Sequence, residues 1–241
     1  MKQFGLIGKT LGHSFSKAFF TEFFEKQKID AQFLNYEFDD ISEIKDLLQN
    51  SIQGLSVTIP YKQTIIPFLD KLSIEASAIG AVNCISFTNG KSIGHNTDSY
   101  GFQQAIKPFL TNRHERAIIL GTGGASKAVE YVLKNLGIDV IFISRNPKKE
   151  NEFSYAEINN HMLNACKLIV NTTPVGTFPN NDDFIEIPFE FLTNQHLVVD
   201  LIYNPSKTML LQKAEEQGTQ ILNGETMLKQ QALKAWEIWN K

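Results

Sequence analysis

Cysteine, arginine and long apolar runs are scarce in this chain of 241 residues, and each shortage excludes a class of protein. Two cysteines, Cys84 and Cys166, are too few for a disulfide framework and fit a reducing cytoplasm. The apolar runs fall far short of the ~20 residues that a membrane-spanning helix needs, and the first residues do not resemble a secretory signal. The formal net charge is −3 without a basic run, which argues against a nucleic-acid partner.

The remaining composition is that of an ordinary globular protein, with 42% hydrophobic and 20% charged residues. These proportions exclude a disordered tail, a collagen and a coiled coil. A chain of this length buries enough surface to fold without disulfides. No cluster of cysteine and histidine has the spacing of metal ligands, so we expect no metal.

Strand-like and helix-like segments alternate along the chain, which indicates an α/β protein. In the first part the expected elements are strands at 4–7, 32–38, 54–58, 82–88 and 91–95 and helices at 16–28 and 41–49. Asn89-Gly90 lies between the last two strands and predicts a type I′ hairpin. Pro60 suits the first turn of a helix, which would place Lys62 in that turn.

The second part follows a polar stretch at 111–116 and has the pattern of a nucleotide-binding domain. Its first four segments form a βαβ unit, namely a strand at 117–120, a glycine turn at 121–124, a helix at 127–136 and a strand at 138–143. Further strands are expected at 168–171 and 197–201, and an amphipathic helix at 225–239. We infer two domains that meet near residue 100, and periodicity alone leaves the terminal helix free to belong to either.

The glycine turn, 121–126 (GTGGAS), follows a strand and opens a helix, which is the setting of a dinucleotide fingerprint. Gly121 allows the tight turn, Gly123 lets the backbone approach a pyrophosphate, and the helix N-terminus offers unpaired N–H donors. The third fingerprint position holds Ser126 instead of glycine. We interpret the turn as dinucleotide-binding, and the alternative is a plain turn between strand and helix.

The strand after the glycine turn ends without the acidic residue that usually binds the ribose of NAD. Arg145 stands there instead, and a guanidinium group binds a phosphate bidentately, whereas a carboxylate would repel it. Only two other arginines, Arg113 and Arg116, occur in the chain. The position of Arg145 therefore favours NADP, and the alternative is a solvated loop arginine.

Four polar clusters lie at the ends of predicted elements in the first domain and are candidates for a substrate site. They are 13–16 (HSFS), 56–62 (SVTIPYK), Asn83 and 96–98 (NTD). Hydroxyl groups at a helix N-terminus can bind a carboxylate, and a lysine can serve as a general acid. Each cluster also has a simpler interpretation, such as helix capping by Ser14 or a surface position for Lys62.

Taken together, these motifs resemble the shikimate dehydrogenase family, NADP-dependent enzymes of aromatic amino-acid biosynthesis. The resemblance covers nearly the whole chain, and the motifs occur in the same order at matching intervals. They are 13–16 (HSFS), 56–62 (SVTIPYK), 80–83 (GAVN), 96–98 (NTD), 121–125 (GTGGA), 171–176 (NTTPVG), 200–205 (DLIYNP) and 224–232 (GETMLKQQA).

The resemblance implies roles for individual residues. Lys62 and Asp98 would form the catalytic pair. The substrate would be bound by Ser14, Ser16, Thr58, Asn83, Tyr203 and Gln231. The cofactor would be bound by Gly121, Thr122, Gly123, Gly124, Ala125, Arg145, Leu201, Gly224 and Met227.

The resemblance also implies a fold and an activity. The fold would have two α/β domains, a substrate-binding domain at 1–99 plus 221–241 and a doubly wound, Rossmann-type NADP-binding domain at 100–220. The activity would be the reversible reduction of 3-dehydroshikimate to shikimate by NADPH, with Lys62 as general acid. The partner would be this small molecule rather than a nucleic acid or a membrane, and the chain would be a monomer or a homodimer.

Two alternatives stay open at this point. The family more often has Asn-Arg-Thr where Ser144-Arg145-Asn146 stands, so the preference for NADP over NAD is not decided. One alternative is therefore a paralogue that uses quinate or NAD. The other is a non-catalytic regulator that binds a dinucleotide or a quinate-like ligand, although intact Lys62 and Asp98 argue against it.

Overall fold

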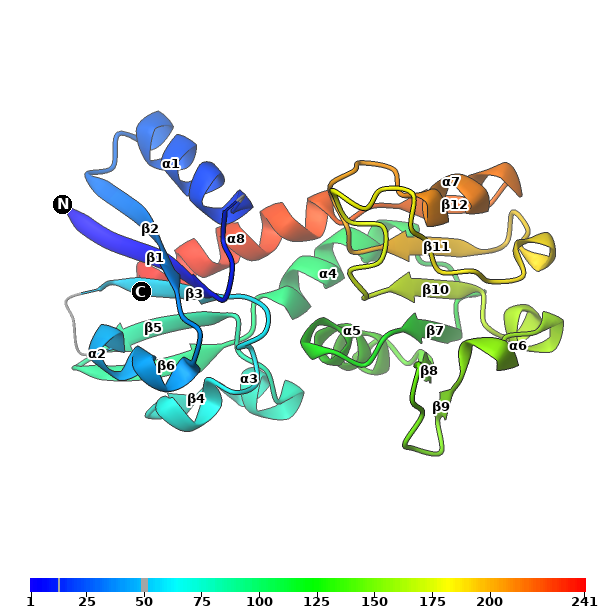
Figure 1. The fold of residues 1–241 in the computed structure, drawn as a ribbon, viewed down its shortest axis with the longest axis horizontal. Coiled ribbons are helices and arrows are strands. Elements are labelled where there is room, and N and C mark those ends of the chain that lie inside the picture. Colours follow the sequence, from blue (N-terminus) through cyan, green and yellow to red (C-terminus); the bar gives the residue numbers. More distant parts are fainter. Residues whose placement is uncertain (13, 49–51) are drawn as a thin grey trace. The chain divides into compact units, whose positions relative to one another are not determined.

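The computed structural model describes residues 1–12, 14–48 and 52–241, and the chain forms two compact units (Figure 1). His13 of the first polar cluster and the end of the helix expected at 41–49 lie outside the described residues. No helix among the described residues has the length and apolar character needed to cross a membrane.

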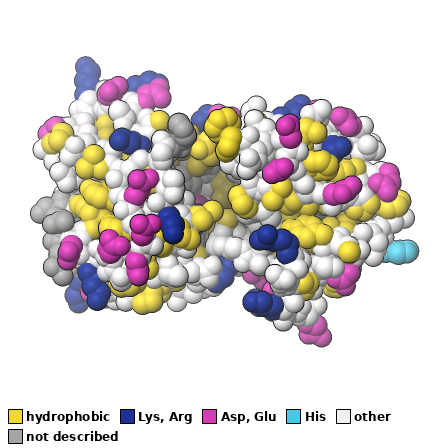
Figure 2. Space-filling model, viewed as in Figure 1, with side chains coloured by type: hydrophobic (Ala, Val, Ile, Leu, Met, Phe, Trp, Pro, Cys, Tyr) yellow, Lys and Arg dark blue, Asp and Glu magenta, His cyan; other side chains and the backbone are white. Residues whose placement is uncertain are grey.

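Unit 1 comprises Met1–Thr97 and Ala232–Lys241, and unit 2 comprises Asp98–Gln231. Each unit contains a six-stranded sheet with helices, so the α/β class predicted from the alternating segments is confirmed. On the face drawn in Figure 2, acidic and basic side chains are interspersed, in keeping with the small net charge of the sequence.

The sheet of unit 1 has the strand order β2-β1-β3-β5-β6-β4. Its strands are β1 (Lys2–Gly8), β2 (Ala31–Glu37), β3 (Gly54–Val57), β4 (Lys71–Leu72), β5 (Cys84–Thr88) and β6 (Lys91–His95). β1 pairs in parallel with β2 and β3, whereas β3, β5 and β6 pair antiparallel. Asn89 and Gly90 have φ angles of 53° and 73°, so the predicted type I′ hairpin is confirmed.

Helices cover both faces of this sheet. The helical elements of unit 1 are α1 (Phe15–Gln27), η1 (Ile41–Glu43), α2 (Ile44–Leu48), η2 (Ile66–Phe68), α3 (Ile74–Ile79) and the end of α8 (Glu225–Trp239). On one face, Phe20 of α1 and Trp239 of α8 pack with Phe4 of β1 in an aromatic core. On the other face, Ile44 of α2 packs with Leu55 of β3.

The helix expected from Pro60 onward is not present, and that expectation was wrong. Residues 60–65 form turns, followed by the short η2. The carbonyl oxygen of Lys62 accepts a hydrogen bond from the N–H of Val82 at 2.7 Å. That oxygen would be the acceptor for Ile66 in an α-helix, but Ile66 donates instead to Gln63. The long-range bond to Val82 therefore replaces the helical one.

The sheet of unit 2 is parallel throughout, with the strand order β12-β11-β10-β7-β8-β9. Its strands are β7 (Arg116–Leu120), β8 (Asp139–Ile143), β9 (Glu152–Phe153), β10 (Leu168–Asn171), β11 (Leu197–Asp200) and β12 (Gln220–Leu222). The order reverses between β7 and β10, as in doubly wound nucleotide-binding folds. The sequence reasoning did not anticipate β9 and β12, which have only two and three residues.

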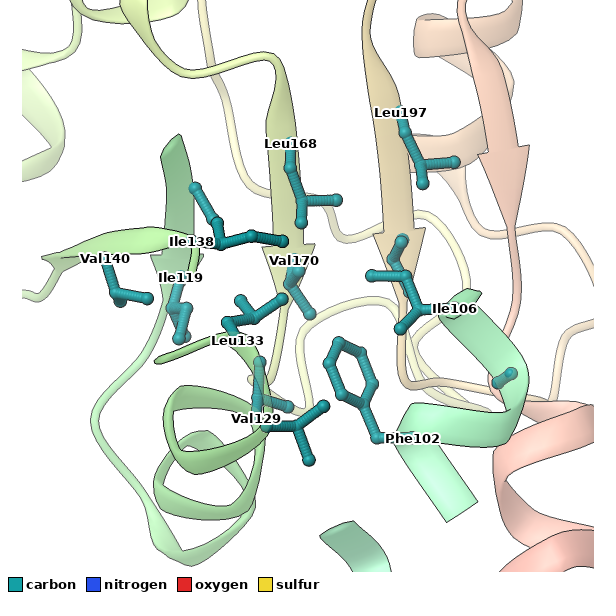
Figure 3. Close-up of a cluster of buried hydrophobic side chains, with 14 of the residues drawn as sticks. Phe102, Ile106, Ile119, Val129, Leu133, Ile138, Val140, Leu168, Val170 and Leu197 are labelled. Atoms are coloured by element: carbon teal, nitrogen blue, oxygen red, sulfur yellow. The ribbon is translucent and has the colours of Figure 1, made fainter. Parts of the chain in front are cut away.

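The helical elements of unit 2 pack on both faces of its sheet. They are α4 (Asp98–Ile106), η3 (Lys107–Phe109), α5 (Gly124–Asn135), η4 (Tyr155–Glu157), α6 (Asn160–Ala165), η5 (Phe189–Phe191), α7 (Met209–Glu216) and the start of α8. Phe102 of α4 and Leu133 of α5 belong to a buried cluster with Val170 of β10 (Figure 3). The preceding residue of the strand, Ile169, points to the other face of the sheet, where it packs in a cluster with Leu211 of α7.

Close packing in unit 1 makes Gly54 a sensitive position. A Cβ atom at Gly54 would overlap the indole ring of Trp239, which is 9% exposed. The same ring is held in place, because its Nε1 donates to the carbonyl oxygen of Ile85 at 3.0 Å. The end of α8 can therefore pack on β3 in this way only because residue 54 has no side chain.

Replacing Gly54 by alanine should lower the free energy of unfolding by about 1–3 kcal/mol, because the methyl group displaces a ring from a packed core. Chemical denaturation followed by fluorescence measures this loss. Gly12→Ala is the control, since a Cβ there meets no atom within 4 Å. If both variants lose equally little stability, Trp239 does not pack on Gly54 as described.

Candidate functional site

The serine cluster at the start of α1 is tied to β2 by its preceding loop. The carbonyl oxygen of Leu11 accepts from Asn35 Nδ2 at 3.0 Å, and the N–H of Leu11 donates to the carboxylate of Glu37. Ser14 is the N-cap of α1, where its Oγ accepts from the N–H of Lys17 at 3.2 Å. The capping role is thus present, and both Ser14 and Ser16 remain partly exposed.

Thr58 and Lys62 lie on the segment that leaves β3. The N–H of Thr58 donates to the carbonyl oxygen of Ile7 at 2.9 Å, and a Cβ on Gly8 would come 2.8 Å from the Thr58 methyl group. The segments that leave β1 and β3 therefore pass close together. Tyr61 anchors this stretch from inside the core, because its hydroxyl donates to the carbonyl oxygen of Asp39 at 3.1 Å. Lys62 itself is half-buried.

A buried amide network joins two more of the polar clusters. Asn83 Oδ1 accepts from the N–H of Thr97 at 2.6 Å, and Asn83 Nδ2 donates to Thr97 Oγ1 at 3.0 Å. Asn96 Nδ2 donates to the carbonyl oxygen of Ala81 at 2.9 Å. The network continues to the lysine segment, because the N–H of Val57 donates to the carbonyl oxygen of Asn83 at 2.8 Å.

These contacts bring the lysine segment, Asn83 and the 96–97 pair together in unit 1. Asn83 is 3% exposed and Thr97 is fully buried, so each hydrogen bond is made away from water, where a missing partner would be costly. Asp98 follows Thr97 directly, opens α4 and is 5% exposed. The network therefore fixes the backbone from which the Asp98 side chain departs.

The glycine turn between β7 and α5 has the geometry of a phosphate-binding turn. Gly121 has a φ of +98°, and a Cβ there would lie 2.8 Å from the Thr173 methyl group, so only glycine fits. Gly123 is the N-cap of α5 and caps it without a side chain, and a Cβ on it would meet no atom within 4 Å. The backbone at Gly123 is therefore open to a ligand, which fits the pyrophosphate of a dinucleotide.

Ser126 explains why the third fingerprint position need not be glycine here. Its side chain is buried at 1% exposure, and its hydroxyl donates to the carbonyl oxygen of Gly123 at 2.6 Å. The serine therefore braces the turn from inside the first turn of α5. The sequence pattern shows only that glycine is absent at this position, and it does not reveal the hydrogen bond that the serine makes.

Arg145 lies just beyond the end of β8 and is exposed. Its loop is held at both ends: the N–H of Ser144 donates to the carbonyl oxygen of Phe153 at 2.8 Å, and the N–H of Lys148 donates to Glu152 Oε2 at 2.8 Å. The structure thus presents a guanidinium group to solvent on a braced loop. This arrangement fits a 2′-phosphate better than a ribose hydroxyl.

The remaining predicted residues lie in two segments of unit 2. Leu201 and Tyr203 follow β11, and Tyr203 is 38% exposed. Gly224 approaches this segment so closely that a Cβ on it would overlap the carbonyl oxygen of Leu201. In α8, Met227 is 8% exposed within the core cluster of Phe102, and Gln231 Nε2 donates to the carbonyl oxygen of Leu228 at 2.9 Å.

Asp200 opens one of the motifs of the sequence, 200–205, but the sequence reasoning assigned it no role. It ends β11, has no exposed surface, and pairs in register with Asn171 at the end of β10. Its carboxylate accepts hydrogen bonds from Thr208 Oγ1 at 2.7 Å, Asn171 Nδ2 at 3.0 Å and the N–H of Ile202 at 3.1 Å. Burial raises the pKa of Asp200 to about 6 against these three bonds. The signals in the sequence are that Asn171 and Asp200 each begin a motif and that each follows an apolar strand, but neither signal reveals the bond between them.

Comparison with known proteins gives consistent similarities along the whole chain. Residues 6–85 match a family model described as the shikimate dehydrogenase substrate binding domain. A shikimate dehydrogenase (NADP(+)) of Clostridium botulinum is 36% identical over 98% of this chain and 95% of its own length.

Two solved structures are similar over the full length of this chain. Shikimate dehydrogenase 1 from Peptoclostridium difficile is 35% identical, with a TM-score of 0.87 over 100% of this chain and 92% of the other. Shikimate 5-dehydrogenase from Listeria monocytogenes, solved in complex with shikimate and NAD, is 30% identical with a TM-score of 0.88, again over 100% and 92%.

Proposed function

Since the chain belongs to the shikimate dehydrogenase family, we propose that it catalyses the reversible, NADPH-dependent reduction of 3-dehydroshikimate to shikimate. The observation that carries this proposal is the buried network that joins the Lys62 segment to Asn83 and Thr97, in a chain that matches such enzymes over 98% of its length. A binding protein without catalysis would have no need of a lysine and an aspartate on so firmly held a backbone.

In this proposal the two units have different binding functions. Unit 1 carries most of the substrate-binding residues, which is supported by the match of residues 6–85 to a substrate-binding domain model. Unit 2 binds NADP, which is supported by its doubly wound sheet and its open glycine turn. The terminal helix α8 starts in unit 2 and ends in unit 1, so both units contribute to its packing.

The cofactor, when bound, supplies the hydride that reduces the ketone. In our assignment the turn at 121–125 binds its pyrophosphate through backbone N–H groups, and Arg145 binds its 2′-phosphate. Leu201, Gly224 and Met227 line the place of the nicotinamide. Of these, Gly224 acts through its backbone, because its close approach to Leu201 leaves no room for a side chain.

The substrate is held and protonated by the polar clusters of the chain. Ser14 and Ser16 donate hydroxyl hydrogen bonds to the substrate carboxylate. Hydrogen bonds to the ring hydroxyl groups or to the carboxylate come from Thr58, Asn83, Tyr203 and Gln231. Lys62 protonates the alkoxide that forms when the ketone is reduced and stabilises its charge before the proton moves. Asp98 orients the lysine ammonium group.

We further assign the protein a small-molecule substrate alone, a cytoplasmic location, and a monomeric or homodimeric state. The interspersed surface charges in Figure 2 offer no continuous basic surface to a nucleic acid on the face shown. Both cysteines are free and buried, as suits a reducing compartment.

A steady-state assay with shikimate or quinate, each with NADP or NAD, tests the proposed function. We expect the shikimate and NADP pair to give the highest kcat/KM. A preference for quinate or for NAD would identify the chain as the paralogue. The assay has to include NAD, because the similar Listeria structure was solved in complex with NAD. Absence of turnover with all four pairs would overturn the proposal in favour of a regulator.

Replacing Lys62 by alanine should lower kcat about a hundredfold or more, because one positioned general acid contributes on that order. The KM for shikimate should change much less. Lys71→Ala, which removes an exposed lysine of the same unit, is the control and should behave as the wild type. A kcat within twofold of the wild type would show that Lys62 is not the acid.

Replacing Arg145 by alanine should weaken NADPH binding by about 2 kcal/mol, the scale of one lost charge-assisted contact. NADH binding should hardly change, because NADH has no 2′-phosphate. Isothermal titration with both cofactors measures the difference, and Arg113→Ala removes another exposed arginine as a control. Equal losses for the two cofactors would mean that Arg145 does not recognise the phosphate.

Gln231 and its neighbour Gln230 offer a matched pair on α8. They are separated by about 100° around the helix, so both cannot face the same ligand. Gln231→Ala should raise the KM for shikimate roughly three- to tenfold, the value of one neutral hydrogen bond, whereas Gln230→Ala should leave it unchanged. If Gln230→Ala has the larger effect, the assignment of Gln231 to the substrate is wrong.

A further inference from the structure

We propose that Asp200 is a positioning residue whose buried carboxylate fixes the strand ends that carry the glycine turn and the Leu201–Tyr203 segment. The inference rests on the proposed function, because these two features are assigned there to the cofactor and the substrate. Asp200 itself has no exposed surface, so its carboxylate is not available to either ligand. Its effect would pass through three neighbours.

The first neighbour, Asn171, connects Asp200 to the glycine turn. Asn171 Nδ2 donates to Asp200 Oδ1, which leaves Asn171 Oδ1 to accept from the N–H and the hydroxyl of Thr173 at 3.0 and 2.8 Å. The methyl group of Thr173 lies 2.8 Å from the position that a Cβ of Gly121 would take. Asp200 therefore fixes the orientation of the Asn171 amide. This amide in turn fixes the position of Thr173, which packs against the glycine turn.

The same strand end is braced from the other side by Thr172. Its hydroxyl and its N–H both donate to the carbonyl oxygen of Leu120, at 2.7 and 3.0 Å. Leu120 is the last residue of β7 and directly precedes Gly121. The ends of β10 and β7 are thus joined by two hydrogen bonds, and Asn171 connects both of them to β11.

The second neighbour is the backbone of Ile202, in the segment that follows β11. Its N–H donates to Asp200 Oδ1 at 3.1 Å, and its carbonyl oxygen accepts from the N–H of Gly224 at 3.0 Å. The N–H of Leu201 donates to the carbonyl oxygen of Asn171 at 3.0 Å. Leu201 and Tyr203, which flank Ile202, therefore leave the sheet in directions that Asp200 helps to fix.

The third neighbour is Thr208, the N-cap of α7, whose hydroxyl donates to Asp200 Oδ2 at 2.7 Å. Thr208 closes the loop that begins at Tyr203, so one carboxylate holds both ends of this loop. A neutral or apolar residue could not accept from all three donors, and a buried carboxylate is costly without such partners. The raised pKa of Asp200 reflects this cost.

Two substitutions each remove the hydrogen bond between Thr208 and Asp200 without creating a cavity. Asp200→Asn keeps one oxygen for Asn171 and Ile202 but cannot accept from Thr208. Thr208→Val removes the hydroxyl and keeps the shape of the side chain. Thr208→Ser keeps the hydroxyl and is the rescue variant. Thr219→Val is the matched control, because Thr219 is also buried in unit 2 and donates its hydroxyl to the carbonyl oxygen of Thr193.

The measurements are the NADPH dissociation constant of each full-length variant, kcat, the KM for shikimate, and the melting temperature. We expect Asp200→Asn and Thr208→Val to raise the NADPH dissociation constant about fivefold or more and to lower kcat about tenfold, since small misplacements of reacting groups are costly. Thr208→Ser should match the wild type. Thr219→Val should lose stability comparable to Thr208→Val and keep wild-type constants.

The inference is overturned if Thr208→Val and Thr219→Val have the same binding and kinetic constants, because Asp200 would then contribute only to stability. If Asp200→Asn does not fold, the two threonine variants still decide the question. Failure of the proposed function would look different, since the wild type would then lack shikimate turnover or NADPH binding before any variant is compared.

Discussion

A buried asparagine beside the end of a strand holds the functional edge of each sheet together. In unit 1, Asn83 bonds with the backbone and hydroxyl of Thr97. In unit 2, Asn171 bonds with Thr173 on one side and Asp200 on the other. An amide has both donors and acceptors, so it can join two segments that each leave a strand with unpaired backbone groups. Because these amides are buried, any movement of the joined segments would break bonds that water does not replace.

This constraint explains how irregular segments can carry chemistry that needs fixed geometry. Lys62 lies in turns rather than in a helix, yet its carbonyl oxygen is bonded to Val82 and the ring of its neighbour Tyr61 is buried. Gly121 similarly lies in a turn, but Thr173 packs against it. Loops held by buried partners combine the accessibility of a loop with the positional accuracy of a strand. The ligand-facing groups are therefore local, whereas the bonds that position them are long-range.

The difference between local features and long-range bonds also separates what the sequence could predict from what it could not. The hairpin at Asn89-Gly90, the glycine turn and the terminal helix depend on neighbouring residues, and local patterns predicted all three. The absence of a helix after Pro60 depends on the bond from Val82 to Lys62, twenty positions apart, and no local pattern contains that bond. The edge strands β9 and β12 are too short for a periodic signal. The bond between Asp200 and Asn171 depends on the register of β10 with β11, and neither segment alone reveals that register.

The contrast between buried contacts and exposed loops also bears on the choice of cofactor. The glycine turn, which we propose binds the pyrophosphate, depends on contacts at the ends of β7 and β10 that either dinucleotide would require. The 2′-phosphate, in contrast, would be recognised by Arg145 on an exposed loop whose bonds include those to the backbone of Phe153 and to Glu152. Substitutions in this loop leave the buried network untouched. Preference between NADP and NAD can therefore change among relatives with one fold at little cost in stability, whereas a change at Asn171 or Asp200 would disturb the binding of both cofactors.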